Sequence, residues 1–198
     1  MKLIDGIKLK GRPAEIPDSS RNELAEFFKE MGFKVGAEVG VYRGAFSEKF
    51  CKAGLKLYAI DPWTGYTGAG RTERVQDMQD YNYECAKKAL APYPDCTIIR
   101  KTSMEALKDF KAESLDFVYI DGDHRFPAIA ADIYEWYPKV KKGGIISGDD
   151  YFCTSPVANN VLCHVKPVVD AFVVTYEIPN FYIIGQKDKK PSWFIIKQ

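Results

Sequence analysis

Carboxylate side chains stand at the ends of two apolar segments of this 198-residue chain. The segment LDFVYID (115–121) ends in Asp121, and GGIISGDD (143–150) ends in Asp149 and Asp150. Three carboxylates brought together repel one another and raise each other's pKa unless a cation lies between them. Oxygen ligands of this kind suit Mg²⁺, Mn²⁺ or Ca²⁺. We therefore predict a divalent metal site at these three aspartates; the alternative is a set of acids that cap helices, bind backbone amides or lie in solvent.

One of the two histidines, His124, follows Asp121 by three residues in the turn DGDHRFP (121–127). Imidazole has an ordinary pKa close to neutrality, which suits it to accept a proton from a hydroxyl group. Coordination of that hydroxyl to a divalent cation makes the proton easier to remove. We predict His124 as the catalytic base, and the alternative is a histidine that only caps or packs the turn. His164 is expected to be structural.

A glycine turn follows an earlier apolar segment, in EVGVYRG (38–44). Gly40 allows a sharp turn, and Gly44 allows the next helix to approach a ligand closely. The spacing differs from the G-x-G-x-x-G of dinucleotide-binding proteins, and Glu38 would repel a pyrophosphate but attract an ammonium group. The turn predicts a cationic ligand without phosphate. The alternative is a tight strand-to-helix turn with a salt-bridged glutamate.

Asp61 ends the next apolar segment, about twenty residues after the glycine turn. An acid at this position binds both hydroxyls of a ribose. A strand-end aspartate alone would mean little, but with Glu38 it favours a nucleoside that carries an amino-acid-like tail. S-adenosylmethionine has this composition.

Extended and helical patterns alternate along the chain. The expected strands are 34–40, 56–63, 96–101, 115–121, 143–150, 180–185 and 192–198, and the expected helices are 18–32, 45–54, 71–93, 103–110, 127–140 and 159–173. Pro167 should kink the last helix. Five strands alternating with helices predict a doubly wound parallel sheet, and the short turn before the last strand predicts an antiparallel hairpin. The expected fold is α/β, with a mostly parallel seven-stranded sheet.

The organisation expected is one domain over 19–198, preceded by an arm or lid at 1–18 that shows little periodicity. A loop at 61–71, which contains Trp63 and Tyr66, is expected either to gate ligands or to be an ordinary surface loop. Trp136 and Trp193 are expected in the core or in an interface rather than in a site.

The composition is that of a soluble protein with a proper core, since 46% of the residues are hydrophobic and 28% are charged. A net charge of +1 gives no general attraction to nucleic acid or membrane, and no apolar run is long enough to span a bilayer. The start lacks the apolar region of a secretory signal. Five cysteines without a C-x-x-C pair favour free thiols. We expect a cytoplasmic protein that acts on a small molecule, and a homo-oligomer is left open.

Over residues 20–198 the chain resembles the class I S-adenosylmethionine-dependent methyltransferases. The motifs that carry the resemblance are E-x-G-x-x-x-G, AIDPW, YIDGDH and the closing hairpin. It implies a Rossmann-like methyltransferase fold. It also implies that Glu38 and Gly40 lie beside the methionine part, that Asp61 binds the ribose, and that Ser103 with Met104 lies beside the adenine. The expected cofactor residues are completed by Tyr42, Gly44 and Asp121.

Two metal-dependent groups within these methyltransferases are similar to parts of this chain. LDFVYID with GGIISGDDY is similar to catechol O-methyltransferase, which implies Asp121, Asp149 and Asp150 as Mg²⁺ ligands. IDGDH is similar to the macrocin and mycinamicin sugar O-methyltransferases, which implies His124 as the base. The leading expectation is metal-assisted O-methylation of a sugar or another small polar metabolite. The alternatives are a metal-independent methyltransferase, a cofactor-binding module without catalysis, and an NAD-dependent oxidoreductase, which Glu38 disfavours.

Overall fold

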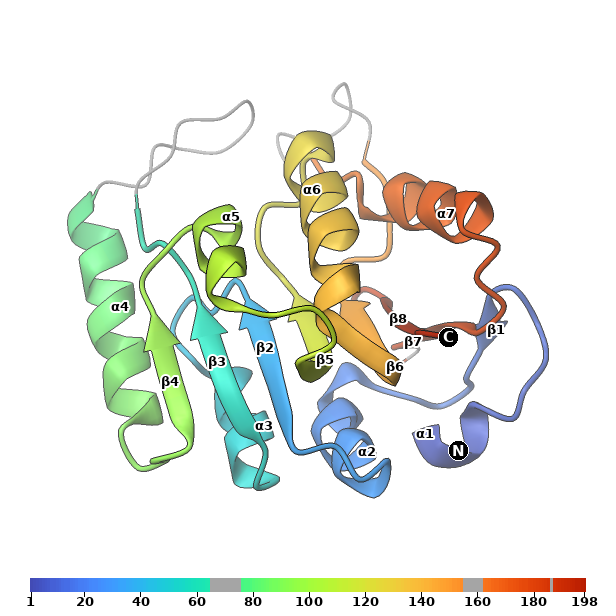
Figure 1. Ribbon diagram of the computed structural model, residues 1–198, viewed down its shortest axis with the longest axis horizontal. Coiled ribbons are helices and arrows are strands. Elements are labelled where there is room, and N and C mark those ends of the chain that lie inside the picture. The colour runs from blue at the N-terminus through green and yellow to red at the C-terminus, as the bar shows by residue number, and fades with distance from the viewer. Residues whose placement is uncertain (65–75, 155–161, 186) are drawn as a thin grey trace.

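The structure, a computed structural model, describes residues 1–64, 76–154, 162–185 and 187–198. Its centre is an eight-stranded sheet with the order β1-β7-β8-β6-β5-β2-β3-β4 (Figure 1). The strands are β1 (Ala14–Glu15), β2 (Val35–Val39), β3 (Lys56–Ile60), β4 (Cys96–Ile99), β5 (Leu115–Ile120), β6 (Val140–Gly148), β7 (Phe181–Ile184) and β8 (Ser192–Ile196). Strands β2 to β6 are parallel to their neighbours among themselves, and β8 pairs antiparallel with both β6 and β7. The predicted parallel sheet and C-terminal hairpin are confirmed.

The sheet has one strand more than the seven predicted. The extra strand, β1, lies in the N-terminal arm and pairs parallel with β7 through Ala14 and Glu15. Two residues are too few to show the alternation of apolar and polar side chains from which a strand is predicted. The arm therefore lies at the β7 edge of the sheet, where it covers a strand edge that would otherwise be open.

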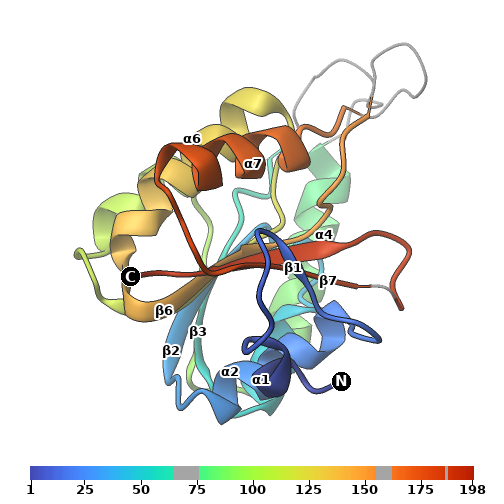
Figure 2. The ribbon, with the colours of Figure 1, turned by 90° about the vertical axis from the view of Figure 1, so that its right-hand side faces the viewer.

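Helices cover both faces of the sheet, which is seen nearly edge-on in Figure 2. One face carries α5 (Ser103–Ala106), η2 (Leu107–Asp109), α6 (Phe126–Trp136), η3 (Tyr137–Lys139) and α7 (Val165–Thr175), and the other carries α1 (Leu3–Gly6), η1 (Arg21–Glu23), α2 (Leu24–Glu30), α3 (Ser47–Lys52) and α4 (Gln76–Leu90). Each face has its own apolar cluster. Trp136 and Trp193 are fully buried core residues, as predicted. None of the described helices has the length and apolar character needed to cross a membrane.

The helix predicted at 159–173 begins later than predicted, and the kink predicted at Pro167 is wrong. Residues 159–161 lie outside the described part of the chain, residues 162–164 are not helical, and α7 begins at Val165. Pro167 therefore lies in the first turn, where its missing N–H has no intrahelical partner to lose and no kink follows. Ser20 caps the start of η1, because its side chain accepts a hydrogen bond from the Asn22 amide at 3.2 Å. Most of the loop at 61–71 lies outside the described residues.

The five parallel strands β2 to β6 point the same way, so their carboxyl ends meet at one edge of the sheet (Figure 1). Ligands of open parallel sheets bind outside this edge. The fold thus places most of the predicted site residues along one rim.

Candidate active site

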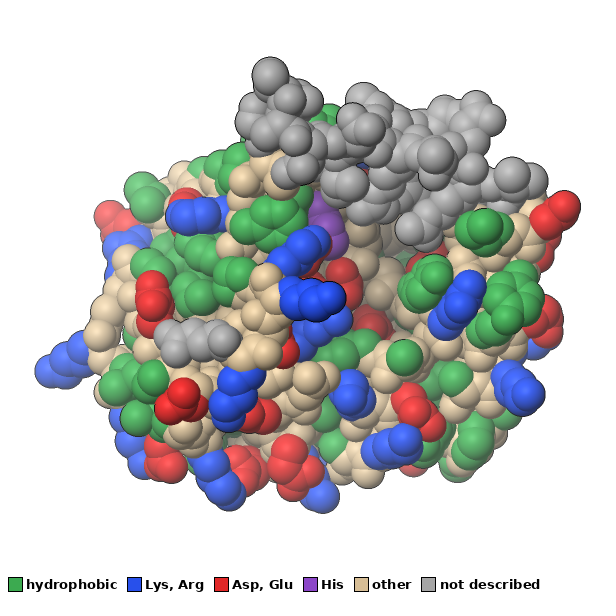
Figure 3. All heavy atoms as spheres, turned by 180° about the vertical axis from the view of Figure 1, so that it is seen from behind, with side chains coloured by type: hydrophobic (Ala, Val, Ile, Leu, Met, Phe, Trp, Pro, Cys, Tyr) green, Lys and Arg blue, Asp and Glu red, His purple; other side chains and the backbone are tan. Residues whose placement is uncertain are grey.

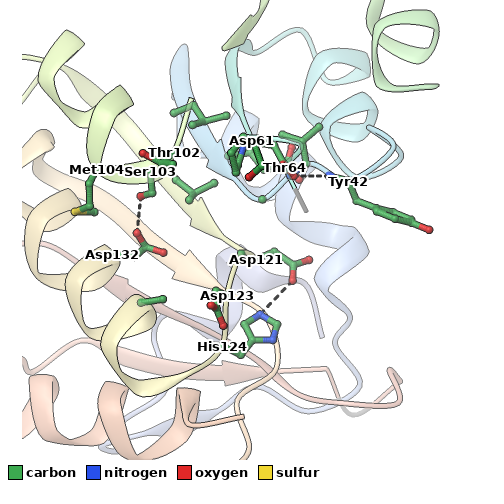
Figure 4. A pocket seen from close by; sticks show the side chains of 18 of the residues that line it. Tyr42, Asp61, Thr64, Thr102, Ser103, Met104, Asp121, Asp123, His124 and Asp132 are labelled. Carbon is green, nitrogen blue, oxygen red and sulfur yellow. Dashed lines mark hydrogen bonds and ion pairs between the residues drawn. The ribbon is translucent and has the colours of Figure 1, made fainter. Parts of the chain in front are cut away.

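A cavity of about 680 Å³ opens at the carboxyl edge of the parallel strands. Of the predicted site residues it is lined by Glu38, Gly40, Tyr42, Asp61, Ser103, Met104, Asp121 and His124. Figure 4 shows Ser103 and Met104 on one side, Asp61 and Tyr42 on another, and Asp121 with His124 on a third. The structure therefore brings most of the predicted cofactor residues and the predicted base to one cavity. Gly44, Asp149 and Asp150 are outside its lining.

The glycine turn is required by the approach of two strands rather than by a ligand. Gly40 has a φ of +94°, and a Cβ atom there would lie 2.2 Å from the carbonyl oxygen of Asp121. No side chain fits at that distance, so the ends of β2 and β5 can meet only at a glycine. At Gly44 a Cβ atom would lie 3.4 Å from atoms of Ala86 and Leu90 in α4, and Gly44 itself is not part of the cavity lining.

Glu38 is almost completely buried, with 1% of its surface exposed, and it lines the cavity wall. The hydroxyl of Ser47 donates a short hydrogen bond to its carboxylate. Burial raises the pKa of Glu38 well above its ordinary value, and the charges of Asp121 and Asp61 add to this effect. A buried carboxylate with no basic partner among the described residues provides a suitable place for a cationic group.

Asp61 is held by the backbone of the glycine turn. Its Oδ2 accepts hydrogen bonds from the amides of Val41 and Tyr42, both at 3.0 Å, and its Oδ1 accepts one from the amide of Trp63 at 2.8 Å. These bonds fix the carboxylate at the rim of the cavity, and Oδ1 keeps a lone pair for a further donor. Asp61 therefore both orders the turn and faces the predicted ribose position.

An additional carboxylate, Asp132, was not found by the sequence analysis. It lines the cavity from α6, is 5% exposed, and accepts a short hydrogen bond from the Ser103 hydroxyl (Figure 4). The same hydroxyl accepts a hydrogen bond from the Trp136 indole at 2.8 Å. Burial raises the pKa of Asp132 to about 6. The available signal was its position in line with Ile129 and Trp136, on the apolar face of the predicted helix.

The acid cluster consists of Asp121, Asp149 and Asp150, which follow β5 and β6. A basic residue that contacts this cluster, Arg21, is the second residue that the sequence analysis missed. The guanidinium group of Arg21, which also lines the cavity, makes a short ion pair with Asp149 and contacts Asp121 at 3.5 Å. It lies over the ring of Phe46, 5.2 Å from the centroid. The Ser192 hydroxyl donates to Asp149 at 2.7 Å. Figure 3 shows acidic and basic side chains gathered around a hollow on this face.

His124 lies between two of the predicted metal ligands. Its Nδ1 is 3.2 Å from Asp150 and its Nε2 is 3.4 Å from Asp121. Burial disfavours the imidazolium, but the two aspartates beside the ring favour it more strongly and raise the pKa of His124 to about 9. The 3.4 Å contact at Nε2 lacks hydrogen-bond geometry, so this buried atom has no hydrogen-bond partner among the described residues.

The acid cluster matches a divalent cation in its chemistry. Its donors are carboxylate oxygens, the pKa of Asp149 is raised by burial and by the charge of Asp121, and Nε2 of His124 is an orphaned buried atom. The three aspartates are nevertheless spread apart. Within the described ranges, three ligand atoms come within 4.8 Å of one another only at His124, Asp150 and Cys163. Asp121 and Asp149 are bridged instead by Arg21, and Asp150 is paired with Lys190 at 2.9 Å.

Comparison with known proteins agrees with this geometry. Residues 37–151 match a sequence family described as "Methyltransferase domain". The uncharacterized protein y4gI of Sinorhizobium fredii (strain NBRC 101917 / NGR234) is 26% identical over 117 residues, which are 55% of this chain but only 12% of that protein.

Solved structures share the fold. An O-methyltransferase from Bacillus cereus in complex with SAH has a TM-score of 0.62 at 14% identity, over 89% of this chain and 80% of the other. A putative caffeoyl-CoA O-methyltransferase from Staphylococcus aureus has a TM-score of 0.64 at 15% identity, over 87% and 80%. An rRNA methylase from Streptococcus thermophilus has a TM-score of 0.60 at 13% identity, over 88% and 93%. Since the family match covers more than half of the chain and includes the strand ends that form the cavity, the protein belongs to the class I S-adenosylmethionine-dependent methyltransferases.

Proposed function

We propose that this protein transfers the methyl group of S-adenosylmethionine to a hydroxyl group of a sugar or another small polar metabolite, with help from a divalent cation. The observation that carries the proposal is the single cavity in which a buried glutamate, a backbone-held aspartate and a histidine between two aspartates line different walls. The first two suit the cofactor, and the third suits an acceptor hydroxyl.

The cofactor half of the cavity offers a group for each part of S-adenosylmethionine. Glu38 accepts the ammonium group of the methionine part, and ionisation of this carboxylate becomes favourable when that positive charge is present. Asp61 accepts hydrogen bonds from the ribose hydroxyls. Ser103 and Met104, with Asp132 beside them, form the wall at which the adenine ring is expected.

The acceptor half requires a base and a positive charge. His124 accepts the hydroxyl proton, and it does so only as neutral imidazole. Because its pKa is about 9, the neutral fraction rises as the pH rises toward that value, and turnover should rise with it. Asp121, Asp149 and Asp150 would hold the divalent cation. When bound, that cation stabilises the deprotonated hydroxyl and opposes the imidazolium of His124.

Metal-independent transfer is the second candidate, and a specific observation favours it. Arg21 and Lys190 already contact the three aspartates, so much of the negative charge is balanced by the chain itself. In that case the acids orient the acceptor, and His124 alone removes the proton. A binding module without catalysis would keep the cofactor half and transfer nothing.

Transfer of a labelled methyl group from S-adenosylmethionine to a panel of sugars and catechols separates these functions. We expect labelled product with Mg²⁺, loss of product with EDTA, and recovery when Mg²⁺ is restored. Equal product with and without EDTA would favour metal-independent transfer. Cofactor binding without product from any acceptor would favour the binding module.

A further inference from the structure

We propose that Arg21 is a tethered cation that takes the place of the divalent metal between Asp121 and Asp149, and that metal binding displaces its side chain. Arg21 then sets the metal affinity of the site. This inference rests on the proposed function, because it concerns the regulation of the same acid cluster.

The first argument is position. Asp121 and Asp149 end neighbouring strands, and a single nitrogen atom of Arg21, Nη1, contacts an Oδ2 atom of each. Two carboxylates that both contact one cationic atom lie close enough together to share a cation. A divalent cation and a guanidinium group repel each other, so both cannot lie between the same two oxygens. Competition follows from this geometry.

The second argument is that the backbone of Arg21 is fixed while its side chain can move. Asp188, in the turn between β7 and β8, accepts hydrogen bonds from the Arg21 amide and from the Ser20 hydroxyl, both at 2.8 Å. The long side chain then reaches the acid cluster across the face of Phe46, and about a third of it is exposed. Rotation about its side-chain bonds can withdraw the guanidinium without disturbing η1.

The third argument is that no neighbouring basic residue in the described part of the chain contacts the same two aspartates. Lys190 contacts only Asp150 among these acids, and 48% of its side chain is exposed. His124 contacts Asp121 and Asp150 but not Asp149 in the described contacts. Among the described basic residues, Arg21 alone contacts both Asp121 and Asp149, so its removal should affect a metal site between these two aspartates most.

The test is direct measurement of Mn²⁺ binding, by the electron paramagnetic resonance signal of free Mn²⁺, in four forms of the full chain. These are the wild type, Arg21→Met, Arg21→Met combined with Asp149→Asn, and Lys52→Met. Methionine keeps the length and apolar contact of the arginine stem without its charge. Lys52 is a matched control, because it loses one charge from an exposed pair with Glu48.

We expect Arg21→Met to bind Mn²⁺ about tenfold more tightly than the wild type, because a competing unit charge has been removed from the site. Lys52→Met should match the wild type, and the added Asp149→Asn should abolish the gain. The same order should appear in the rise of the melting temperature on adding Mn²⁺, which also reports that the variant is folded.

Equal Mn²⁺ affinity in the wild type and Arg21→Met would overturn the inference and leave the proposed metal-assisted function standing. Weaker binding in Arg21→Met would also overturn it, since Arg21 would then support the metal. Absence of Mn²⁺ binding in every form would overturn both the inference and the metal component of the proposed function.

Discussion

The two halves of the site are held together in different ways. In the cofactor half, the Asp61 carboxylate is bound by backbone amides of Val41 and Tyr42, and Gly40 lies against the backbone of Asp121. In the acid cluster, the contacts of Arg21 with Asp121 and Asp149 involve side chains only. Backbone contacts permit one geometry, whereas side-chain ion pairs can exchange partners.

The difference indicates that the two halves of the site have different functions. A rigid cofactor half fits a ligand that is the same in every turnover, and an adjustable acid cluster fits a site where a cation and an acceptor must enter and leave. The contacting residues also differ in how far apart they lie in the sequence. Val41 and Asp61 in the cofactor half are 20 residues apart, whereas Arg21 and Asp149 are 128 residues apart. The following variants test the comparison.

The largest effect is expected for Gly40→Ala. A Cβ at this position would lie 2.2 Å from a backbone oxygen, where the neighbouring strand cannot yield. We expect a loss of at least about 3 kcal/mol in the free energy of unfolding, measured with urea. Gly54→Ala is the control: it has a similar φ of +83° but nothing within 4 Å, so it should lose only about 1 kcal/mol. Equal losses would show that the strand ends are not rigid.

Glu38→Gln should weaken binding of S-adenosylmethionine strongly while leaving the fold intact. The variant loses the charge that attracts the ammonium group, and we expect the dissociation constant to rise about a hundredfold, as measured by calorimetry. The unfolding free energy should rise, because burial of the carboxylate is costly and the amide can still accept from Ser47. An unchanged dissociation constant would remove Glu38 from the cofactor site.

Asp132→Asn should change how stability depends on pH. The pKa of Asp132 is raised from 3.8 to about 6 in the folded protein, so the folded state holds its proton more tightly than the unfolded state. Its stabilising contribution is complete below pH 3.8 and is lost as the pH rises to about 6. The difference in unfolding free energy between wild type and variant should shift by about 3 kcal/mol across this window. A constant difference would mean that Asp132 titrates normally.

Lys190→Met should have the smallest effect. Its ion pair with Asp150 is half-exposed, and pairs of this kind contribute less than about 1 kcal/mol. The change in urea unfolding should therefore be small, and the response should be smaller still at high salt. A loss as large as that of Gly40→Ala would mean that the acid cluster is as rigid as the cofactor half.

The sequence predicted the cofactor half better than the acid cluster, for a physical reason. Strand ends, glycine turns and strand-end acids are local features, and the parallel order of the sheet brings them to one rim. Glu38, Asp61 and Asp121 could therefore be placed from apolar periodicity alone. The place of Gly44 beside α4 could not be read in this way, because a glycine in a turn does not reveal which surface it faces.

Arg21 and Asp132 could not be predicted in this way. Arg21 looks like an ordinary polar residue in the first turn of a helix, and its partner Asp149 lies 128 residues away. Asp132 could have been recognised as an acid on an apolar helix face, but its partner Ser103 is known only from the packing of α5 against α6. The two-residue strand β1 is too short for any periodic signal.

The most direct test of the account is a crystal structure with S-adenosylhomocysteine and Mn²⁺. We predict the methionine tail at Glu38, the ribose hydroxyls at Asp61 and the adenine beside Ser103 and Met104. Anomalous scattering should place Mn²⁺ at Asp121, Asp149 and Asp150, with the Arg21 side chain withdrawn. The ligand bound elsewhere, or these acids facing solvent without a shared cavity, would contradict the account.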